Sequence, residues 1–238
     1  MVSNAFRIVL QVRTNSSRLP AKALLPLAGM PSALLVTSRA SRLKDDFVVA
    51  TSDNTSDDYL SRIIEDAGRR VFRGPLDDVL GRFVLATNDM EPNDWCVRIT
   101  ADNPFPDAEF IHHLVEKFAH SGLDYASSED LFSQHLPYGL SAEIFTVSQL
   151  RAAHQNAHSA SDREHVTPYI RRTSNVGKLE RLESGTNNLP RCTLDTFEDY
   201  ITLLEFFETV SDPVTVPWEE LVNNFTEFLG RTAHNRVQ

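Results

Sequence analysis

"FRIVLQVRTNSSRLPAK", residues 6–22, joins an apolar run to a polar turn. Residues 6–12 are mainly apolar, the pattern of a strand that is buried on both faces of a sheet. The turn that follows carries three cations within ten residues, Arg13, Arg18 and Lys22. In an open α/β sheet, ligands bind beyond the carboxyl ends of the strands, so this turn is the expected site of an anionic ligand.

The cationic turn is not a common glycine-rich phosphate loop. The patterns GxxxxGK[ST] and GxGxxG are absent, and no glycine lies between residues 1 and 28. Turn amides and hydroxyls can still hold phosphate oxygens, which arginine and lysine neutralise. Pro20 limits the freedom of the turn, so less entropy is lost when a ligand binds. The alternative is a solvated turn with scattered surface cations.

Beyond the turn, strand and helix patterns alternate, which predicts an α/β fold with a mostly parallel sheet flanked by helices. No linker is long enough to separate two domains, so we expect a single domain over 1–238, with a core over about 6–208 and a tail at 212–238 that holds a short helix. Strands are expected at 6–12, 45–52, 71–74, 95–100, 124–127, 142–147, 176–183 and 191–195. Helices are expected at 31–43, 55–68, 77–87, 107–122, 148–157, 162–172, 197–210 and 218–230, with Asp107 as an N-cap and Gly68 and Gly122 as C-caps.

The composition argues against several classes of protein. The net charge of −10 argues against nucleic-acid binding, which usually needs a basic surplus or stripe. A small anionic ligand needs only a local positive pocket, because salt screens the remote carboxylates. The sequence contains no run of 18 apolar residues, so we expect no membrane span. Cys96 and Cys192 lie in strand-like segments without metal-ligand spacing, which indicates reduced core thiols in a cytoplasmic protein.

Six segments resemble, in order, those of the sugar-nucleotide cytidylyltransferases. The cationic turn is similar to the family signature Q-A-R-x-G-S-x-R-L-P-x-K-x-L, and the whole set is most similar to the branch of the spore coat polysaccharide biosynthesis protein F (SpsF). The CMP-sialate and CMP-Kdo synthetases resemble it more distantly. The segments are "QVRTNSSRLPAKALLPLAGMP" (11–31), "VVATS" (48–52), "VFRGPLDDVLGRF" (71–83), "VRITADNPFPD" (97–107), "REHVTPYI" (163–170) and "TLDTFEDY" (193–200).

The resemblance implies the nucleotide-diphospho-sugar transferase fold, a GT-A, Rossmann-like fold. It also implies a Mg²⁺-dependent reaction, in which CMP passes from CTP to a sugar or other small anionic acceptor and pyrophosphate is released, for surface polysaccharide biosynthesis. Such a protein must align an acceptor oxygen with the α-phosphorus and neutralise the triphosphate. A second copy of the chain, in a homodimer, is the further partner that the resemblance suggests.

The family signature places most of the nucleotide contacts in the turn after the first strand. Asn15 and Ala21 depart from it, because each replaces a glycine. Asn tolerates left-handed backbone angles better than most residues, so Asn15 is expected to preserve the turn, whereas Ala21 adds a methyl group where backbone would approach a phosphate. The implied nucleotide-binding residues are Gln11, Arg13, Asn15, Ser16, Arg18, Lys22, Asp78, Arg98 and Thr100, and the implied catalytic residues are Arg13, Lys22 and Asp102.

Asp102 and Asp195 match the metal-binding aspartates of the family. Each follows a predicted strand, which would bring its carboxylate to the ligand-binding edge of the sheet. Carboxylate and phosphate oxygens are the ligands that Mg²⁺ prefers. Without the resemblance, we would interpret Asp102 as a turn residue before Pro104 and Asp195 as a helix N-cap. Asn103 is a mild departure, since relatives often read D-C-P or D-E-P.

Two arginines outside the turn have competing interpretations. Asp78 and Arg82 lie four residues apart on one predicted helical face, where they form either a weak surface ion pair or part of the site for the base and ribose. Arg98 lies on a predicted buried strand and therefore needs a carboxylate or phosphate partner.

The acceptor site is expected in the less regular second half of the chain. "LPYGLSAEIF" (136–145) is similar to the family segment P-x-G-L-D-x-E, in which Gly139 and Glu143 remain as expected acceptor contacts. Ser141 replaces the family aspartate, which suggests a different acceptor or a shifted site.

Glu164 and His165 are the other expected acceptor contacts. Ser161 and Glu164 also fit a helix capping box, which is the alternative for Glu164. His165 is either a packed histidine or a proton acceptor at the sugar site. His112 and His113 lie on a predicted amphipathic helix, where we expect structural or surface roles.

Two other functions remain open at this point. One is a different enzyme on the same fold, either a nucleotidyltransferase for another base or a glycosyltransferase, although the D-x-D motif expected of the latter is absent. The other is a catalytically weak nucleotide-binding subunit, which Asn15, Ala21 and Ser141 keep open. A fold alone does not decide between them.

Overall fold

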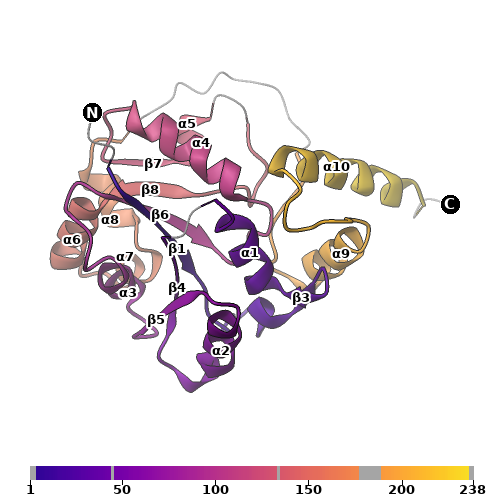
Figure 1. The fold of residues 1–238 in the computed structure, drawn as a ribbon, viewed down its shortest axis with the longest axis horizontal. Helices are drawn as coiled ribbons and strands as arrows, with labels where there is room; N and C mark the ends of the chain where they lie inside the picture. The colour runs from indigo at the N-terminus through magenta and orange to yellow at the C-terminus, as the bar shows by residue number, and fades with distance from the viewer. Residues whose placement is uncertain (1–3, 44–45, 133–134, 177–188, 236–238) are drawn as a thin grey trace.

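The structure is a computed structural model that describes residues 4–43, 46–132, 135–176 and 189–235. A six-stranded sheet forms its centre, in the strand order β5-β4-β1-β6-β8-β7, and helices cover both of its faces (Figure 1). The strands of this sheet are β1 (Phe6–Gln11), β4 (Phe47–Ser52), β5 (Arg70–Gly74), β6 (Trp95–Thr100), β7 (Tyr125–Ser127) and β8 (Glu143–Thr146), and a separate ribbon pairs β2 (Pro26–Leu27) with β3 (Met30–Pro31). The helices are η1 (Lys22–Leu24), α1 (Ser32–Ala40), η2 (Thr55–Asp57), α2 (Asp58–Asp66), α3 (Val79–Ala86), α4 (Ala108–Ala119), α5 (Ser128–Leu131), α6 (Val147–Asn156), α7 (Ala160–His165), α8 (Pro168–Thr173), α9 (Phe197–Phe207) and α10 (Trp218–Asn235).

The pairing of the strands confirms the mostly parallel sheet. Strands β5, β4, β1 and β6 run parallel, and β8 is antiparallel to both β6 and β7. The register pairs Gln11, the last residue of β1, with Ala50 of β4 and with Thr100, the last residue of β6. The loops that follow β1 and β6 therefore begin side by side at one edge of the sheet, where ligands bind in open α/β sheets.

Alternation along β1 divides the hydrophobic core into two layers. Ile8 and Leu10 face a layer that contains residues of α1, α2, α4, α9 and α10, whereas Val9 faces a layer that contains residues of α3, α6 and α8. All three side chains are fully buried. Because helices cover both faces, the strand is a near-continuous apolar run in the sequence.

The C-terminal segment packs into the same core as the sheet. The Phe225 ring of α10 lies 5.2 Å, between centroids, from Phe105 in the loop after β6. Arg39 of α1 is fully buried and donates hydrogen bonds to the carbonyl groups of Phe105, Pro213 and Val216. The hydrophobic core therefore reaches beyond residue 208, into the segment that the sequence predicted to be a tail.

Two predicted elements near the site have a different structure. Residues 191–195 form no strand, and Arg191 makes only an isolated bridge to Tyr138. The predicted helix at 162–172 is divided into α7 and α8, because Val166 has a φ of 67° and Pro168 lacks the amide that would continue α7.

Other boundaries also differ from the predictions. The C-terminal helix is 18 residues long rather than short, and α5 lies inside a predicted loop. The Asp107 side chain caps α4 as predicted, but that helix ends with His120 as its C-cap, two residues before Gly122. Val176 bridges Tyr125, and the remainder of the strand predicted at 176–183 lies outside the described residues.

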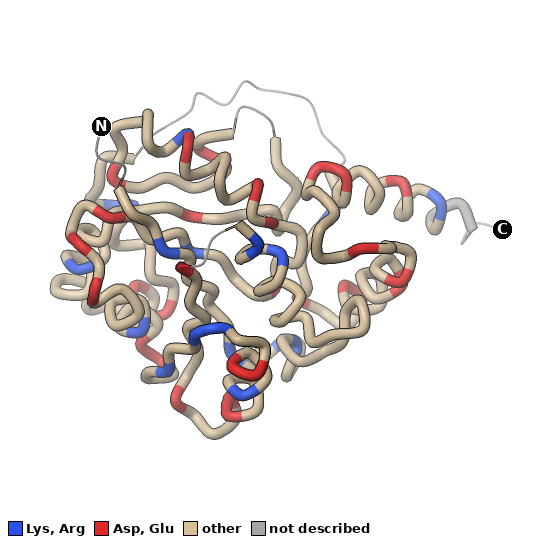
Figure 2. The backbone as a smooth tube through the Cα atoms, viewed as in Figure 1, with Lys and Arg blue, Asp and Glu red and all other residues tan. Residues whose placement is uncertain are grey.

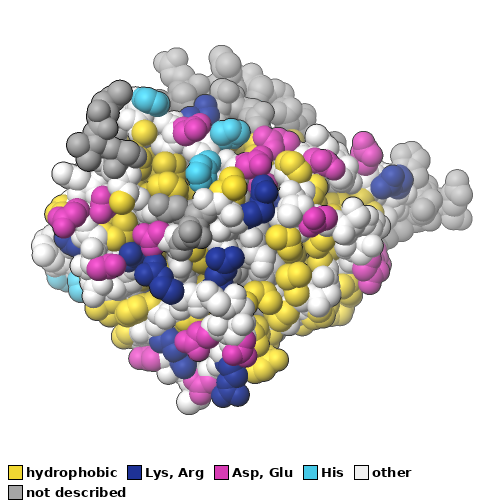
Figure 3. Space-filling view, viewed as in Figure 1, with side chains coloured by type: hydrophobic (Ala, Val, Ile, Leu, Met, Phe, Trp, Pro, Cys, Tyr) yellow, Lys and Arg dark blue, Asp and Glu magenta, His cyan; other side chains and the backbone are white. Residues whose placement is uncertain are grey.

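The surface carries charges of both signs. Acidic positions follow one another along α9 and α10 (Figure 2), and basic and acidic side chains are interspersed on the face shown in Figure 3. Within the described residues, no helix combines the length and apolar character that crossing a membrane requires.

Candidate active site

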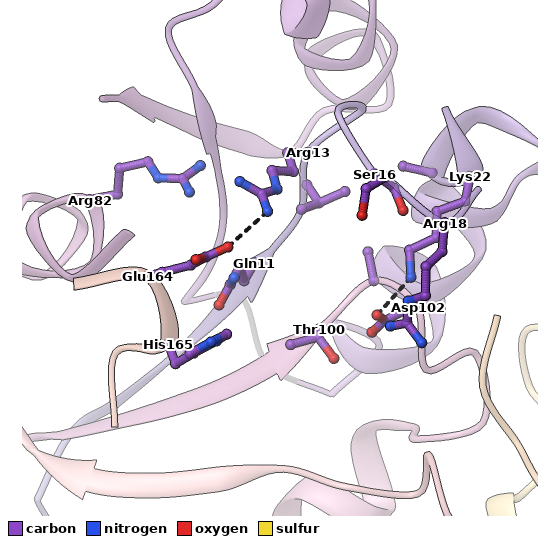
Figure 4. Close-up of a pocket in the computed structure, with 14 residues that line it drawn as sticks. Gln11, Arg13, Ser16, Arg18, Lys22, Arg82, Thr100, Asp102, Glu164 and His165 are labelled. Carbon is purple, nitrogen blue, oxygen red and sulfur yellow. Dashed lines mark hydrogen bonds and ion pairs between the residues drawn. The ribbon is translucent and has the colours of Figure 1, made fainter. Parts of the chain in front are cut away.

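A cavity of about 310 Å³ lies at the carboxyl ends of β1 and β6 (Figure 4). The turn after β1 forms one wall, and α3 and α7 contribute side chains from the other side of the sheet. Of the predicted nucleotide-binding residues, Asn15, Asp78 and Arg98 do not line it. Its lining residues are Gln11, Val12, Arg13, Ser16, Ser17, Arg18, Lys22, Ala23, Arg82, Thr100, Ala101, Asp102, Glu164 and His165.

Thr14 organises the turn after β1. Its amide and its hydroxyl both donate to Asp57 Oδ1, at 2.8 and 2.6 Å, and its carbonyl accepts from the amides of Ser16 and Ala21. Asp57 is fully buried and also accepts hydrogen bonds from Thr51 and Ser52. Burial raises the pKa of the Asp57 carboxyl, but these hydrogen bonds outweigh burial and leave the pKa below its ordinary value. The buried carboxylate of Asp57, the last residue of η2, therefore links the cationic turn to the end of β4 and holds the turn in place.

Ala21, and not Asn15, adopts the left-handed conformation in this turn. Its φ is 57° and its ψ is 22°, whereas the φ of Asn15 is not positive. The expectation that Asn15 preserves the turn through left-handed angles is therefore wrong. Glycine adopts such angles at no steric cost, whereas alanine is strained there, so the second departure from the family signature is the costly one.

The three cations of the turn are each paired with a carboxylate from a distant segment. Arg13 Nη2 lies 3.1 Å from Glu164 Oε1 on α7. Lys22 Nζ lies 2.9 Å from Asp102 Oδ2 and 3.0 Å from Asp195 Oδ1. Arg18, Lys22 and Arg191 all pair with Asp195, whose side chain is only 4% exposed. The positive charge of the turn is thus balanced within the protein, across the cavity that it lines.

Arg82 differs from these cations because, among the described residues, no carboxylate forms an ion pair with it. It is fully buried on α3, and all three of its side-chain nitrogens lack a hydrogen-bond partner among the described residues. Burial lowers the pKa of Arg82, and the nearby charge of Arg13 lowers it further. Asp78 does not form the predicted ion pair with Arg82. Instead it caps α3 by accepting from the Gly81 amide, and it pairs with Arg163 of α7.

Asp102 and Asp195 are brought together, as the metal prediction requires, although Asp195 does not follow a strand. Thr196, and not Asp195, is the N-cap of α9, so the capping alternative for Asp195 is wrong. Burial raises the pKa of Asp102, but the Lys22 charge and hydrogen bonds outweigh it and lower the pKa overall. The Asp102 and Asp195 carboxylates and the Leu194 carbonyl each place an oxygen within 3.0 Å of Lys22 Nζ.

This arrangement of oxygens fits Mg²⁺. The positively charged Lys22 Nζ lies among three oxygen atoms that could each coordinate a cation. Carboxylate and carbonyl oxygens are the ligand type that Mg²⁺ prefers. Within the described residues, no group of three or more His, Cys, Asp or Glu side chains could hold a metal alone. Two carboxylates suit a Mg²⁺ site that is completed by phosphate oxygens and water.

Arg98 has its partners within the protein and lies beside the main cavity. It is paired with Glu143 of β8 and donates to Gln11 Oε1 at 2.9 Å. Glu143 also accepts hydrogen bonds from Tyr125 and Thr167, at 2.6 and 2.8 Å. Burial raises the pKa of Glu143, but Arg98 and these hydrogen bonds outweigh burial and lower it. Glu143 is therefore occupied in holding Arg98 between β6 and β8.

Two smaller cavities adjoin the main one at Thr100, which lines all three. The first, of about 250 Å³, includes Arg98, Glu143 and Arg171. The second, of about 240 Å³, includes Gly139 together with Asp102 and Asp195. Of the four predicted acceptor contacts, Gly139 and Glu143 thus lie in the smaller cavities, and Glu164 and His165 lie in the main one.

Local structure explains the positions of two predicted acceptor contacts, Gly139 and Glu164. Gly139 has a φ of 95°, and a Cβ atom there would lie 2.5 Å from the Cys192 carbonyl oxygen, so only glycine fits. Ser159, and not Ser161, caps α7 by accepting from the Asp162 amide, so the predicted capping box is wrong. Glu164 is therefore free of a capping role and pairs with Arg13.

The sequence interpretation left Arg82 unresolved and missed Asp57, Arg163 and Arg191. The signal for Arg82 was an arginine among apolar residues of a predicted helix, and its four-residue spacing from Asp78 left a surface ion pair and a site for the base and ribose equally open. Asp57 lies in a polar, serine-rich stretch whose burial no local pattern indicates.

Comparisons with known proteins agree with this geometry. The sequence profile of the family described as Cytidylyltransferase matches residues 7–221. The chain is 37% identical to the uncharacterized protein MJ1063 of Methanocaldococcus jannaschii, over 83% of this chain and 81% of that protein. It is 30% identical to the spore coat polysaccharide biosynthesis protein SpsF of Bacillus subtilis, over 92% of this chain and 93% of that protein. A solved cytidylyltransferase structure from Leptospira borgpetersenii covers 95% of this chain and 96% of its own, with a TM-score of 0.81 and 25% identity.

The resemblance to the SpsF branch and the nucleotidyltransferase fold are thereby confirmed. The profile match spans both the cationic turn and the segments that bring Asp102, Glu164 and Asp195 to it. The profile match over most of the chain and the 30% identity to SpsF over nearly its full length lead to one conclusion: this protein is a nucleotidyltransferase that belongs to the cytidylyltransferase family.

Proposed function

We propose that this enzyme binds CTP in the cavity at the ends of β1 and β6, transfers CMP to a small, anionic, sugar-like acceptor and releases pyrophosphate. The observation that carries the proposal is Arg82, a fully buried guanidinium that lines this cavity without a partner among the described residues. A buried cation without a counter-charge is costly. A triphosphate in the cavity would supply that counter-charge.

Arg13 and Lys22 would bind the triphosphate together with Arg82. Both line the cavity, and both already reach carboxylate oxygens across it, at 3.1 and 2.9 Å. Phosphate oxygens are equivalent partners for these groups. In the proposed reaction, an acceptor oxygen bonds to the α-phosphorus while the bond from that phosphorus to pyrophosphate breaks. The cations would stabilise the negative charge that develops on the leaving pyrophosphate.

Asp102 and Asp195 would hold Mg²⁺ at the same edge of the sheet. A divalent cation bound there neutralises and orients phosphate oxygens. Asp195 is well placed for this role because Arg191 donates a hydrogen bond to its second carboxylate oxygen, Oδ2, at 2.8 Å. This bond fixes the orientation of the Asp195 carboxylate. Asp102 lines the main cavity, and its side chain is 29% exposed.

The acceptor would bind in the cavity that contains Gly139 and Ser141. This cavity shares Thr100 and Asp102 with the main cavity, so an acceptor there would lie beside the α-phosphorus. Ser141 accepts a hydrogen bond from Asn103 at 3.2 Å, which joins two departures from the family pattern at one point. The similarity to SpsF supports an acceptor from surface polysaccharide biosynthesis.

Pyrophosphate release with each of the four nucleoside triphosphates, against a panel of sugar acceptors, tests this function. We expect release with CTP and Mg²⁺ only, with a sugar of the surface polysaccharide class as the acceptor. Calorimetric titration should show CTP binding in preference to ATP, GTP and UTP. Equal or tighter binding of GTP would instead favour a nucleotidyltransferase for another base.

The proposal includes a reducing, cytoplasmic setting and a homodimer. Cys96 and Cys192 are both free and buried, and burial raises the pKa of both thiols, as expected for reduced core cysteines. The homodimer stays a prediction, which sedimentation equilibrium would test.

A further inference from the structure

Lys22 is positioned as a bound cation would be. Its side chain is 14% exposed, and Nζ lies 2.9 Å from Asp102 Oδ2, 2.9 Å from the Leu194 carbonyl oxygen and 3.0 Å from Asp195 Oδ1. An ammonium group has three hydrogens to donate. These three oxygens use all of them, so Lys22 is fully satisfied without a nucleotide.

We propose that the Lys22 ammonium occupies the metal position in the nucleotide-free enzyme, so that a divalent cation binds well only after Lys22 has left. The inference rests on the proposed function, because it takes Asp102 and Asp195 as the metal ligands. It adds that the protein closes its own metal site with an internal cation. Free Mg²⁺ would therefore bind weakly, and nucleotide and metal would bind as coupled events.

Electrostatics and geometry both indicate that Lys22 and a metal ion compete for the same position. A metal ion cannot occupy the position of the Lys22 ammonium while that group is in place, and the repulsion between two neighbouring cations opposes the attraction that each has for the carboxylates. Metal binding must therefore displace the Lys22 hydrogen bonds to Asp102 and Asp195. Charge-assisted hydrogen bonds are roughly twice as strong as neutral ones, so their loss reduces the apparent metal affinity.

A triphosphate offers Lys22 an alternative partner. Lys22 lines the main cavity as well as touching the two aspartates, so its side chain lies between the expected phosphate site and the expected metal site. A phosphate group that attracts Lys22 would release the carboxylates for the metal. By thermodynamic linkage, the nucleotide then strengthens metal binding by the same factor as the metal strengthens nucleotide binding.

Arg18 provides a control at the same site. Its guanidinium also pairs with Asp195 Oδ1, at 2.9 Å, but among the described residues that carboxylate is its only acidic partner. Its side chain is 64% exposed. Arg18→Met thus removes one positive charge from Asp195 and leaves Lys22 between the two aspartates. Lys117→Met removes the same charge from an exposed position on α4, which lines none of the three cavities.

The test is a titration of the nucleotide-free protein with Mn²⁺ alone. Binding is measured as the loss of the electron paramagnetic resonance signal of free Mn²⁺. We expect Lys22→Met to bind Mn²⁺ about tenfold or more tightly than the wild type, and Arg18→Met and Lys117→Met to gain less than about threefold. Adding Asp102→Asn to Lys22→Met should abolish the gain, which assigns it to this site. Lys22→Gln, measured with a thermal midpoint for each variant, provides a second neutral replacement if Lys22→Met is unstable.

Two results would overturn the inference. One is a folded Lys22→Met or Lys22→Gln variant that binds Mn²⁺ no more tightly than the wild type. The other is an equal gain in Arg18→Met, because the effect would then come from local charge and not from the position of Lys22. Failure of the proposed function would be distinguishable, since it would appear as absent CTP binding, and no nucleotide enters the Mn²⁺ titration.

Discussion

Arg13 and Arg82 direct their guanidinium groups toward each other across the cavity, and within the described part of the chain Arg13 alone of the two is paired with a carboxylate, Glu164 at 3.1 Å (Figure 4). Two facing cations repel each other, and the Arg13 charge lowers the pKa of Arg82. This arrangement is unfavourable in the protein alone. It would become favourable if an anion with several negative charges, such as the triphosphate of the proposed nucleotide, lay between the two groups.

Replacing Arg82 with methionine should separate ligand binding from stability. The side chain keeps its approximate length and loses its charge, so we expect CTP affinity to fall by at least about tenfold, on the order of 1.4 kcal/mol. Because none of the described residues hydrogen-bonds this buried guanidinium, the thermal midpoint should stay the same or rise.

Calorimetric titration and thermal denaturation on the same sample would measure both effects. Arg42→Met is the matched control for Arg82→Met, because Arg42 pairs with Glu109 on α4, outside the three cavities. It should leave CTP affinity unchanged. Unchanged affinity in folded Arg82→Met would remove Arg82 from the nucleotide site.

Ala21→Gly should stabilise the protein. Alanine at a φ of 57° is strained by about 1–2 kcal/mol, and glycine adds roughly half of that in lost chain entropy, so the expected gain is about 0.5–1 kcal/mol. Denaturant unfolding would measure it. Ala23→Gly is the control, because Ala23 is buried and has no positive φ, and we expect it to destabilise the fold by about 1 kcal/mol. A loss of stability in Ala21→Gly would contradict the strain that we assign to this turn.

Asp57→Asn should loosen the cationic turn and change the pH dependence of stability. Its hydrogen bonds hold the folded pKa below the ordinary value of 3.8, so the carboxylate stabilises the fold above that pH, and this contribution is lost as pH falls through the lowered pKa. We expect Asp57→Asn to cost about 2–3 kcal/mol near neutral pH, with a smaller difference from wild type in acid below 3.8.

Denaturant unfolding at a series of pH values checks this expectation for Asp57. Asp53→Asn, one residue beyond β4 and exposed, is the control and should change little at any pH. CTP affinity should also fall in Asp57→Asn, because Thr14 loses its anchor. A constant difference from wild type across the whole pH range would show that the carboxylate charge is not what stabilises the turn.

Asp102→Asn should keep the fold and lose most of the activity. Asparagine is nearly isosteric but neutral, so we expect turnover to fall by about a hundredfold, which is about 2.7 kcal/mol of barrier. The thermal midpoint should change little, because the Asp102 side chain is partly exposed. The turn interpretation predicts the opposite, a loss of stability with near-normal turnover. Pyrophosphate release and the thermal midpoint, measured on the same variant, decide between the metal and the turn interpretations of Asp102. Asp53→Asn is the control, because Asp53 also follows a parallel strand.

The sequence alone determined the sheet and the place of the site. Apolar β-branched runs such as 6–12 and 95–100 predicted β1 and β6, because strands covered on both faces carry that pattern locally. The strand-end rule pointed to the turn after residues 6–12 as an anion site, and the family resemblance added Asp102; the structure brings Arg13, Lys22 and Asp102 to one cavity.

Only the tertiary structure decided how the charges of the site are balanced. Lys22 reaches Asp195 across 173 positions of sequence, and Arg13 reaches Glu164 across 151. The left-handed angle of Ala21, and the lack of a hydrogen-bond partner for Arg82 in the part of the chain that the structure describes, likewise depend on which segments surround them. Local periodicity reports which face of an element is buried, but pairing between distant side chains depends on how the elements pack, and no pattern along the chain encodes those distances.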